Sequence, residues 1–211
     1  MKNIPLYARG DNWFYRLVRV LAKFSLAAVY RVEGSGAEHL PPKGPAIIAS
    51  NHKSMLDPFF VGQVFRRPVK YFAKTELFRN GALRWAITEL GAIEIKRGES
   101  DRAGLQMALQ ALTEGEALII YPEGHRKRDQ RVHEFLPGVG MLALRSGVPV
   151  VPVAVKGSEQ VIDRGRLGLP QVKVKVGPPV DLTGLAGKKS VMYAQAADRI
   201  HDAVAALYET L

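Results

Sequence analysis

The sequence predicts an α/β domain with a mostly parallel sheet flanked by helices and preceded by an amphipathic N-terminal helix. Short apolar runs of strand length alternate along the chain with longer runs of helical periodicity. Several strand-like runs are apolar at every position, which is typical of strands covered on both faces. The 211 residues are 47% hydrophobic and 24% charged, a composition that excludes long disorder. We therefore expect a helical part, residues 1–31, and one α/β domain, residues 32–211.

The first expected element is a helix over residues 12–30, whose apolar side chains recur at spacings of three and four. Residues 1–31 contain six basic residues and one acidic residue, a net charge of +5 out of +10 for the chain. A basic helix bearing aromatic residues suits an anionic membrane surface. The alternative is a helix packed on the domain with its arginines in water. No apolar run is long enough for a membrane span, and no signal-peptide cleavage site follows.

The remaining elements follow from the same alternation. Strands are expected at residues 30–33, 46–50, 69–73, 92–96, 117–121, 150–155 and 172–176. Helices are expected at residues 58–65, 82–90, 101–113, 138–145 and 191–211. No internal repeat and no low-complexity linker interrupts this order.

Composition limits the chemistry available to the chain. The absence of cysteine excludes disulfides, thiolate zinc sites, iron–sulfur clusters and a cysteine nucleophile, and it is compatible with a reducing compartment. The net charge of +10 favours polyanionic partners such as anionic lipids, phosphorylated substrates or nucleic acid. Aromatic residues are only 8% of the chain and do not alternate with the basic runs, so no nucleic-acid partner is expected.

The first candidate site is the segment from Asn51 to Asp57, which follows the apolar strand 46–50. Ligands of α/β folds bind at such strand ends. On a continuous helix His52 and Asp57 would point about 140° apart, so a loop must join them. Pro58 favours a helix start here, which predicts Asp57 as the N-cap. The carboxylate would then fix the imidazole tautomer and leave the other nitrogen as a general base. The pair alone is weak evidence, because accidental pairs of this spacing are common.

The second candidate site is the turn Tyr121-Pro122-Glu123-Gly124-His125-Arg126, which follows the apolar strand 117–120. Arg126 would bind phosphate as a bidentate fork, and Gly124 would let the backbone approach the ligand. Glu123 would accept a hydrogen bond from a substrate hydroxyl or hold an arginine. The alternative is a solvated basic loop, the commoner origin of such runs.

Two further segments are less specific. A strand over residues 92–96 places Arg97 at its end, where an ordinary edge-of-sheet arginine is the alternative. Residues 148–152 are apolar and contain two prolines, which predicts a bulged or channel-lining strand. By itself this segment indicates a role in the fold and not in the chemistry.

Taken in order, these four segments resemble the glycerolipid acyltransferase family, the 1-acylglycerol-3-phosphate acyltransferases, from about residue 44 to 157. The family's Asn-His-x4-Asp block falls on Asn51, His52 and Asp57. Its Pro-Glu-Gly-x-Arg block ends at Arg126, its glycine-to-arginine block runs from Gly91 to Arg97, and its proline-rich apolar block falls on residues 148–152. Four blocks in the family's order and spacing are more specific than any one of them.

The resemblance implies an acyltransferase-type fold with His52 as catalytic base and Asp57 as its orienter. It implies that Arg97, Glu123 and Arg126 bind the glycerol phosphate of the acceptor, and we count Asn51 and Gly124 with these substrate-binding residues. The implied reaction moves a fatty acyl group from acyl-CoA or acyl carrier protein to 1-acylglycerol 3-phosphate, giving phosphatidic acid. No other cofactor and no metal are expected. The implied location is the cytoplasmic face of the cell membrane, as a peripheral or monotopic protein.

Two departures from the family pattern leave the acceptor open. His125 stands where the family usually has threonine, and Leu136 stands where a lysine is common. The alternatives are another lysolipid or lipid-linked acceptor, or a non-catalytic basic membrane-binding module. A hydrolase using Ser54 is disfavoured, because Ser54 lacks the glycine-flanked turn of such nucleophiles. A metal site from Glu123, His125, Asp129 and His133 matches no established ligand spacing.

Overall fold

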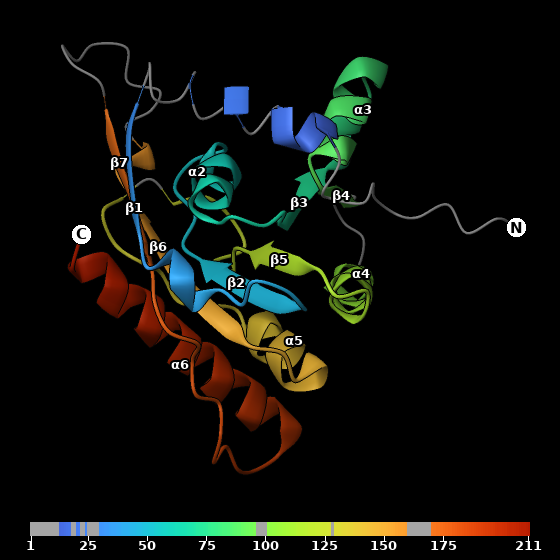
Figure 1. Cartoon of the computed structure of the whole chain (residues 1–211). Coiled ribbons are helices and arrows are strands. Elements are labelled where there is room, and N and C mark those ends of the chain that lie inside the picture. The colour runs from blue at the N-terminus through green and yellow to red at the C-terminus, as the bar shows by residue number, and fades with distance from the viewer. Residues whose placement is uncertain are drawn as a thin grey trace, which may run out of the picture.

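The computed structural model describes residues 13–17, 20–21, 24, 30–95, 101–127, 129–159 and 170–211. Its centre is a seven-stranded sheet in the order β1-β7-β6-β2-β5-β3-β4 (Figure 1). The strands are β1 (Arg31–Ser35), β2 (Ala46–Ser50), β3 (Lys70–Lys74), β4 (Ala92–Ile95), β5 (Ala117–Ile120), β6 (Val150–Lys156) and β7 (Gln171–Val176).

The sheet is parallel except at one side. Strands β2 to β6 run in one direction, whereas β7 pairs antiparallel with β6 and β1 pairs parallel with β7. All five residues of β2 are buried, as expected for a central strand covered on both faces. The predicted fold class is confirmed.

Helices cover both faces of the sheet. They are α2 (Asp57–Val64), α3 (Gly81–Glu89), α4 (Asp101–Thr113), α5 (Gly138–Ser146) and α6 (Lys189–Glu209), with short 3-10 turns η1 (Ala37–His39) and η2 (Thr75–Phe78). Figure 1 shows α2 on one side of the sheet and α4, α5 and α6 on the other. The sequence prediction contained all five helices but neither 3-10 turn.

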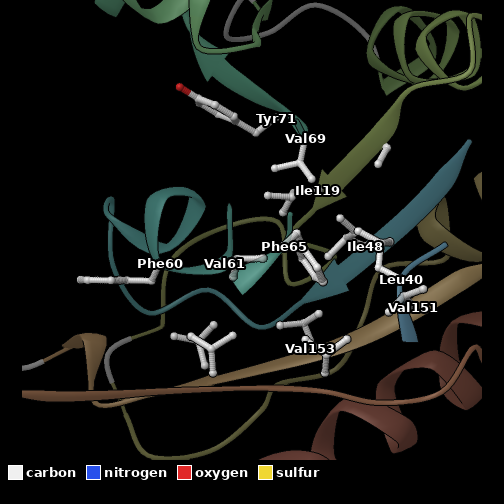
Figure 2. Close-up of a cluster of buried hydrophobic side chains, with 14 of the residues drawn as sticks. Leu40, Ile48, Phe60, Val61, Phe65, Val69, Tyr71, Ile119, Val151 and Val153 are labelled. Atoms are coloured by element: carbon white, nitrogen blue, oxygen red, sulfur yellow. The ribbon is translucent and has the colours of Figure 1, made fainter. Parts of the chain in front are cut away.

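Alternate residues of the buried strands form two separate cores. Ile48 and Ile119 pack with Phe60, Val61 and Phe65, which come from α2 and the residue after it. Figure 2 shows this cluster between α2 and the sheet. The neighbouring strand residues, such as Ile47 and Leu118, face the opposite way and pack under α4, α5 and α6. These two cores hold the carboxyl ends of β2 and β5 in fixed positions.

The predicted bulge near Pro152 is wrong. Strand β6 stays in register with β2 from Val150 to Val153 without interruption. Pro152 is tolerated because the pairing of β6 with β7 begins one residue later, at Val153. The N–H group that proline lacks is therefore not needed for a hydrogen bond between β6 and β7.

Part of the predicted N-terminal helix lies among the described residues. Residues 13–17 are helical, with Tyr15 buried and Trp13 73% exposed. The Phe14 ring contacts the Trp85 ring of α3 with 4.4 Å between centroids. The helix therefore packs on the domain through one face. Among the described residues no helix is long and apolar enough to cross a membrane, and the predicted boundary at residue 31 stays a prediction.

Candidate active site

The site begins where β2 ends. The side chain of Asn51 is fully buried, and its amide pairs with the backbone of Val155 in β6. Its Nδ2 donates to the Val155 carbonyl and its Oδ1 accepts from the Val155 N–H, each at 2.8 Å. These two bonds extend the β2–β6 pairing beyond the last strand residue. Asn51 thus fixes the backbone immediately before His52, which favours a positioning role over the substrate contact that the resemblance implies.

His52 and Asp57 meet as the sequence predicts. Asp57 Oδ2 lies 2.8 Å from His52 Nδ1 and also accepts from the backbone N–H groups of Lys53 and Ser54, both at 2.7 Å. The carboxylate is fully buried, whereas the His52 side chain is 19% exposed. Because the protonated Nδ1 donates a hydrogen bond to Asp57, Nε2 is left as the acceptor. No described residue bonds to Nε2.

The prediction that Asp57 is an N-cap is wrong. Helix α2 begins at Asp57 itself, and Leu56 is the N-cap in a helical conformation. The carboxylate points back to the N–H groups of Lys53 and Ser54 instead of forward into the helix. A single side chain therefore closes the loop and orients the imidazole.

Tyr121 supports the other side of the imidazole. Its ring stacks on the His52 ring with 4.1 Å between centroids and 21° between planes. Burial raises the pKa of Tyr121 well above its usual value, and the charge of Asp57 adds to this effect. The phenol therefore stays neutral and supplies a flat apolar surface. The sequence contained Tyr121 as the first residue of the turn but gave no sign of this contact.

Glu123 joins two backbone segments beneath the site. It is buried, and its oxygens accept from the N–H groups of His52 at 3.4 Å and His133 at 3.2 Å. Burial raises the pKa of Glu123, while the hydrogen bond from His133 and the charge of Lys53 oppose the shift. This geometry makes Glu123 a residue that holds the His52 backbone in place.

Lys53 was not singled out by the sequence. Its side chain is buried, and its ammonium contacts Asp129 Oδ1 at 3.5 Å and the Arg131 carbonyl. Asp129 also contacts His133 Nε2 at 2.7 Å. Lys53 therefore ties the His52 loop to the segment that follows the Glu123 turn. No group of three histidine, aspartate or glutamate side chains within the described part of the chain is arranged to hold a metal ion.

The turn after β5 presents its polar face outward. Gly124 has a φ of 75°, a left-handed conformation that favours glycine. Arg126 is exposed beside it and has no partner among the described residues. Its backbone neighbour Lys127 donates to the His52 carbonyl at 2.8 Å, which fixes the turn against the His52 loop. An exposed arginine on a turn that is bonded to the His52 loop is suited to binding an anion.

The two positions that depart from the family pattern both lie at this turn. His125 is exposed. Leu136 is 58% exposed, and its side chain lies against Gly124. Arg97 lies outside the described residues, so its predicted role stays a prediction.

The arrangement is suited to moving a proton. An oriented and partly exposed imidazole and an arginine without a partner among the described residues come from two loops at the carboxyl ends of adjacent parallel strands, where α/β folds bind ligands. The supports that the sequence did not reveal are the contacts of Lys53, Tyr121, Val155 and His133. Each of these contacts joins segments that are far apart in the sequence or lies within the second turn, so no local pattern marks it as support for the His52–Asp57 pair.

A model of the acyltransferase family matches residues 31–156, more than half of the chain. This range contains β1 to β6, together with the His52–Asp57 pair and the Glu123 turn. The chain belongs to the acyltransferase family.

Within that family the chain is similar to 1-acyl-sn-glycerol-3-phosphate acyltransferases. It is 31% identical over 190 residues to the alpha enzyme of Homo sapiens, across 86% of this chain and 67% of that one. It is 29% identical over 173 residues to a chloroplastic enzyme of Brassica napus, across 79% of this chain. The chain spans about half the length (49%) of that chloroplastic relative.

A solved structure has the same fold. The crystal structure of the 1-acyl-sn-glycerophosphate acyltransferase PlsC from Thermotoga maritima superposes with a TM-score of 0.71 and 26% identity. The match covers 90% of this chain and 78% of the other. The similarity therefore extends beyond the motifs to nearly the whole domain.

Proposed function

We propose that the protein transfers a fatty acyl group from a thioester to the free hydroxyl of 1-acylglycerol 3-phosphate, giving phosphatidic acid. The observation that carries the proposal is the His52–Asp57 pair, with a 2.8 Å contact at Nδ1 and an accessible imidazole at the end of β2. The relatives' names supply the acceptor.

In the proposed reaction His52 acts twice. Its Nε2 takes the proton of the acceptor hydroxyl while the oxygen attacks the thioester carbonyl carbon. The tetrahedral intermediate then collapses, the carbon–sulfur bond breaks, and the imidazolium returns the proton to the thiolate. Asp57 stabilises the imidazolium throughout. General acid–base catalysis of this kind contributes about 10² to 10⁴ in rate.

Two arginines bind the acceptor phosphate in the proposed complex. Arg126 is exposed and unpaired among the described residues, so its guanidinium can take two phosphate oxygens. Arg97 is proposed as the second phosphate ligand. Gly124 permits the left-handed turn that presents Arg126. Asn51 and Glu123 contribute to binding by fixing the loop from which His52 projects.

The proposed donor is acyl-CoA or acyl carrier protein, and the proposed working place is an anionic membrane surface on the cytoplasmic side. The exposed apolar residues Trp13, Leu17 and Phe24 support peripheral attachment through the N-terminal helix. A different lysolipid acceptor is the second candidate. The exposed Leu136, beside the phosphate-binding turn, favours it because an apolar side chain adds nothing to the binding of charge.

Free-thiol release from a long-chain acyl-CoA tests the proposal. We expect release that requires 1-acylglycerol 3-phosphate and that yields one phosphatidic acid per thiol. Release with 1-acylglycerol, which lacks the phosphate, should be much slower. Release that is independent of any acceptor would identify a thioesterase and contradict the proposal. Equal rates with both acceptors would support the second candidate.

A further inference from the structure

A cavity lies at the opposite end of the sheet from His52. It has a volume of about 560 Å³ and lies between the N-terminal helix and the loops that precede β2 and β3. Its described lining residues are Tyr15, Arg16, Pro42, Lys43, Gly44, Arg66, Arg67 and Pro68. Four of these are cationic and none is acidic.

Two of the cations have no partner within the part of the chain that the structure describes. Lys43 and Arg66 are exposed, and neither has a hydrogen bond or an ion pair with any described residue. An adjoining cavity of about 490 Å³ shares Arg66 and Arg67, and Glu38 is the one carboxylate among its described lining residues. Converging cations repel one another unless an anion lies between them, so the cavity has the charge of an anion-binding site.

A third cation is held rigidly in place. Arg67 donates to the carbonyls of Pro41, Gly44 and Gly115 at 3.0, 2.7 and 3.4 Å. Burial lowers the pKa of Arg67, and the charge of Glu116 partly opposes that shift. These three bonds hold the Arg67 guanidinium on backbone carbonyls at the floor of the cavity, and no described carboxylate lines the cavity there. The site is therefore built into the loops of the fold.

The cavity is separate from the acceptor site described above. Gly44 precedes β2 and His52 follows it, and the five residues of that strand alone span roughly 15 Å at about 3.3 Å per residue. A glycerol phosphate bound at His52 is far shorter than this distance. An anion in the cavity is consequently a second ligand and not the phosphate of the reacting acceptor.

We propose that the cavity binds the phosphate of an anionic phospholipid headgroup in the bilayer on which the protein works. The N-terminal helix connects the cavity with the membrane surface. Tyr15 and Arg16 line the cavity, whereas Trp13 and Leu17 of the same helix are exposed. An apolar surface that enters the bilayer interface would bring headgroup phosphates to the cations beneath it. The site does not depend on the acyl transfer reaction.

The phosphate-binding arm of the test uses inorganic pyrophosphate as probe, titrated calorimetrically into the full chain at constant ionic strength. All proteins carry Arg126→Gln, which removes the anion ligand beside His52. The test variant adds Lys43→Gln and Arg66→Gln. The matched control adds Arg145→Gln and Lys189→Gln, two exposed cations on α5 and α6 that have no partner among the described residues. We expect the test variant to lose pyrophosphate binding and the control to keep it. Equal binding by the two would overturn the site.

The lipid arm uses vesicles, with Arg126 intact. Lys43→Gln with Arg66→Gln should lower partition onto phosphatidylglycerol-containing vesicles by about tenfold or more, and partition onto neutral phosphatidylcholine vesicles by little. The control pair should change both by less than about twofold. Loss of pyrophosphate binding without this vesicle effect would refute the lipid headgroup and assign the site to a soluble phosphate anion. The rate of acyl transfer in detergent should be the same for the Lys43→Gln, Arg66→Gln protein and the native protein. This assay therefore tests the proposed reaction independently of the proposed headgroup site.

Discussion

Two substitutions at Asp57 separate its electrostatic role from its structural role. Asp57→Asn keeps an acceptor oxygen for the N–H groups of Lys53 and Ser54 but removes the negative charge beside His52. Asp57→Ala removes both the charge and the acceptor. We expect both variants to lose most of the activity and only the alanine variant to lose much stability.

The magnitudes follow from the three bonds that Asp57 Oδ2 accepts. Alanine leaves two buried N–H groups unsatisfied, at about 1–3 kcal/mol each. The resulting loss of about 2–6 kcal/mol would lower Tm on the order of 10 °C in a chain of this length. Asparagine weakens these bonds by removing their charge assistance and should cost about 1 kcal/mol. Without the carboxylate the imidazole loses its tautomer control, and the rate should fall by about 10² to 10⁴ in either variant, and by no more than in His52→Ala.

The assay is phosphatidic acid formation from acyl-CoA and 1-acylglycerol 3-phosphate, with thermal unfolding measured on the same preparations. The asparagine variant should combine a near-native Tm with a large loss of kcat. A rate within tenfold of the native rate would refute the electrostatic role of Asp57. Equal Tm values for the alanine and asparagine variants would refute the contribution of the two backbone bonds.

Three other predictions concern the phosphate ligand, the loop beyond it and the N-terminal helix. Arg126→Ala should raise the KM for a phosphate-bearing acceptor by about tenfold or more and leave that for an uncharged acceptor nearly unchanged, with Arg145→Ala as control; equal effects on both acceptors would contradict the role of Arg126. Desolvation acts to raise the pKa of Asp129, but hydrogen bonds from His133 and Arg131 prevail and lower it from 3.8 to about 2. Because the folded pKa lies below the unfolded one, this stabilisation is present above pH 4 and is lost as the pH falls towards 2. Thermal unfolding should show a flatter acid limb for Asp129→Asn than for the native chain, and identical profiles would refute this. Deletion of residues 1–29 should weaken binding to anionic vesicles, more at low than at high ionic strength; unchanged sedimentation with vesicles would leave the helix only a structural role.

Local sequence patterns predicted most of the elements because burial makes those patterns strong. Strand β2 was predicted at residues 46–50, and α4 at residues 101–113, with the bounds that the structure has. The direction of β7 could not be predicted, since it depends on pairing with β6 and β1 across the chain. Its burial pattern, in which only alternate residues are buried, marks a strand with one half-exposed face, but such a pattern does not determine direction.

The contact between His52 and Asp57 was predictable because the two residues are five apart and Pro58 limits the loop between them. The contacts that support this pair were not. Asn51 reaches Val155 across 104 positions, and His52 reaches Glu123 across 71. Only the three-dimensional order of β2, β5 and β6 brings these residues together. The N-cap prediction failed for a local reason, because the Asp57 carboxylate bonds to the preceding loop and leaves the start of α2 to Leu56.

The role of His52 is tested most directly by comparing native protein with His52→Ala in phosphatidic acid formation, followed by mass spectrometry in vesicles. The proposed mechanism predicts a fall in kcat of about 10² to 10⁴, with unchanged Tm and unchanged affinity for 1-acylglycerol 3-phosphate. A folded His52→Ala protein that keeps half of the native rate would contradict the assignment of His52 as the base and, with it, the proposed mechanism of acyl transfer.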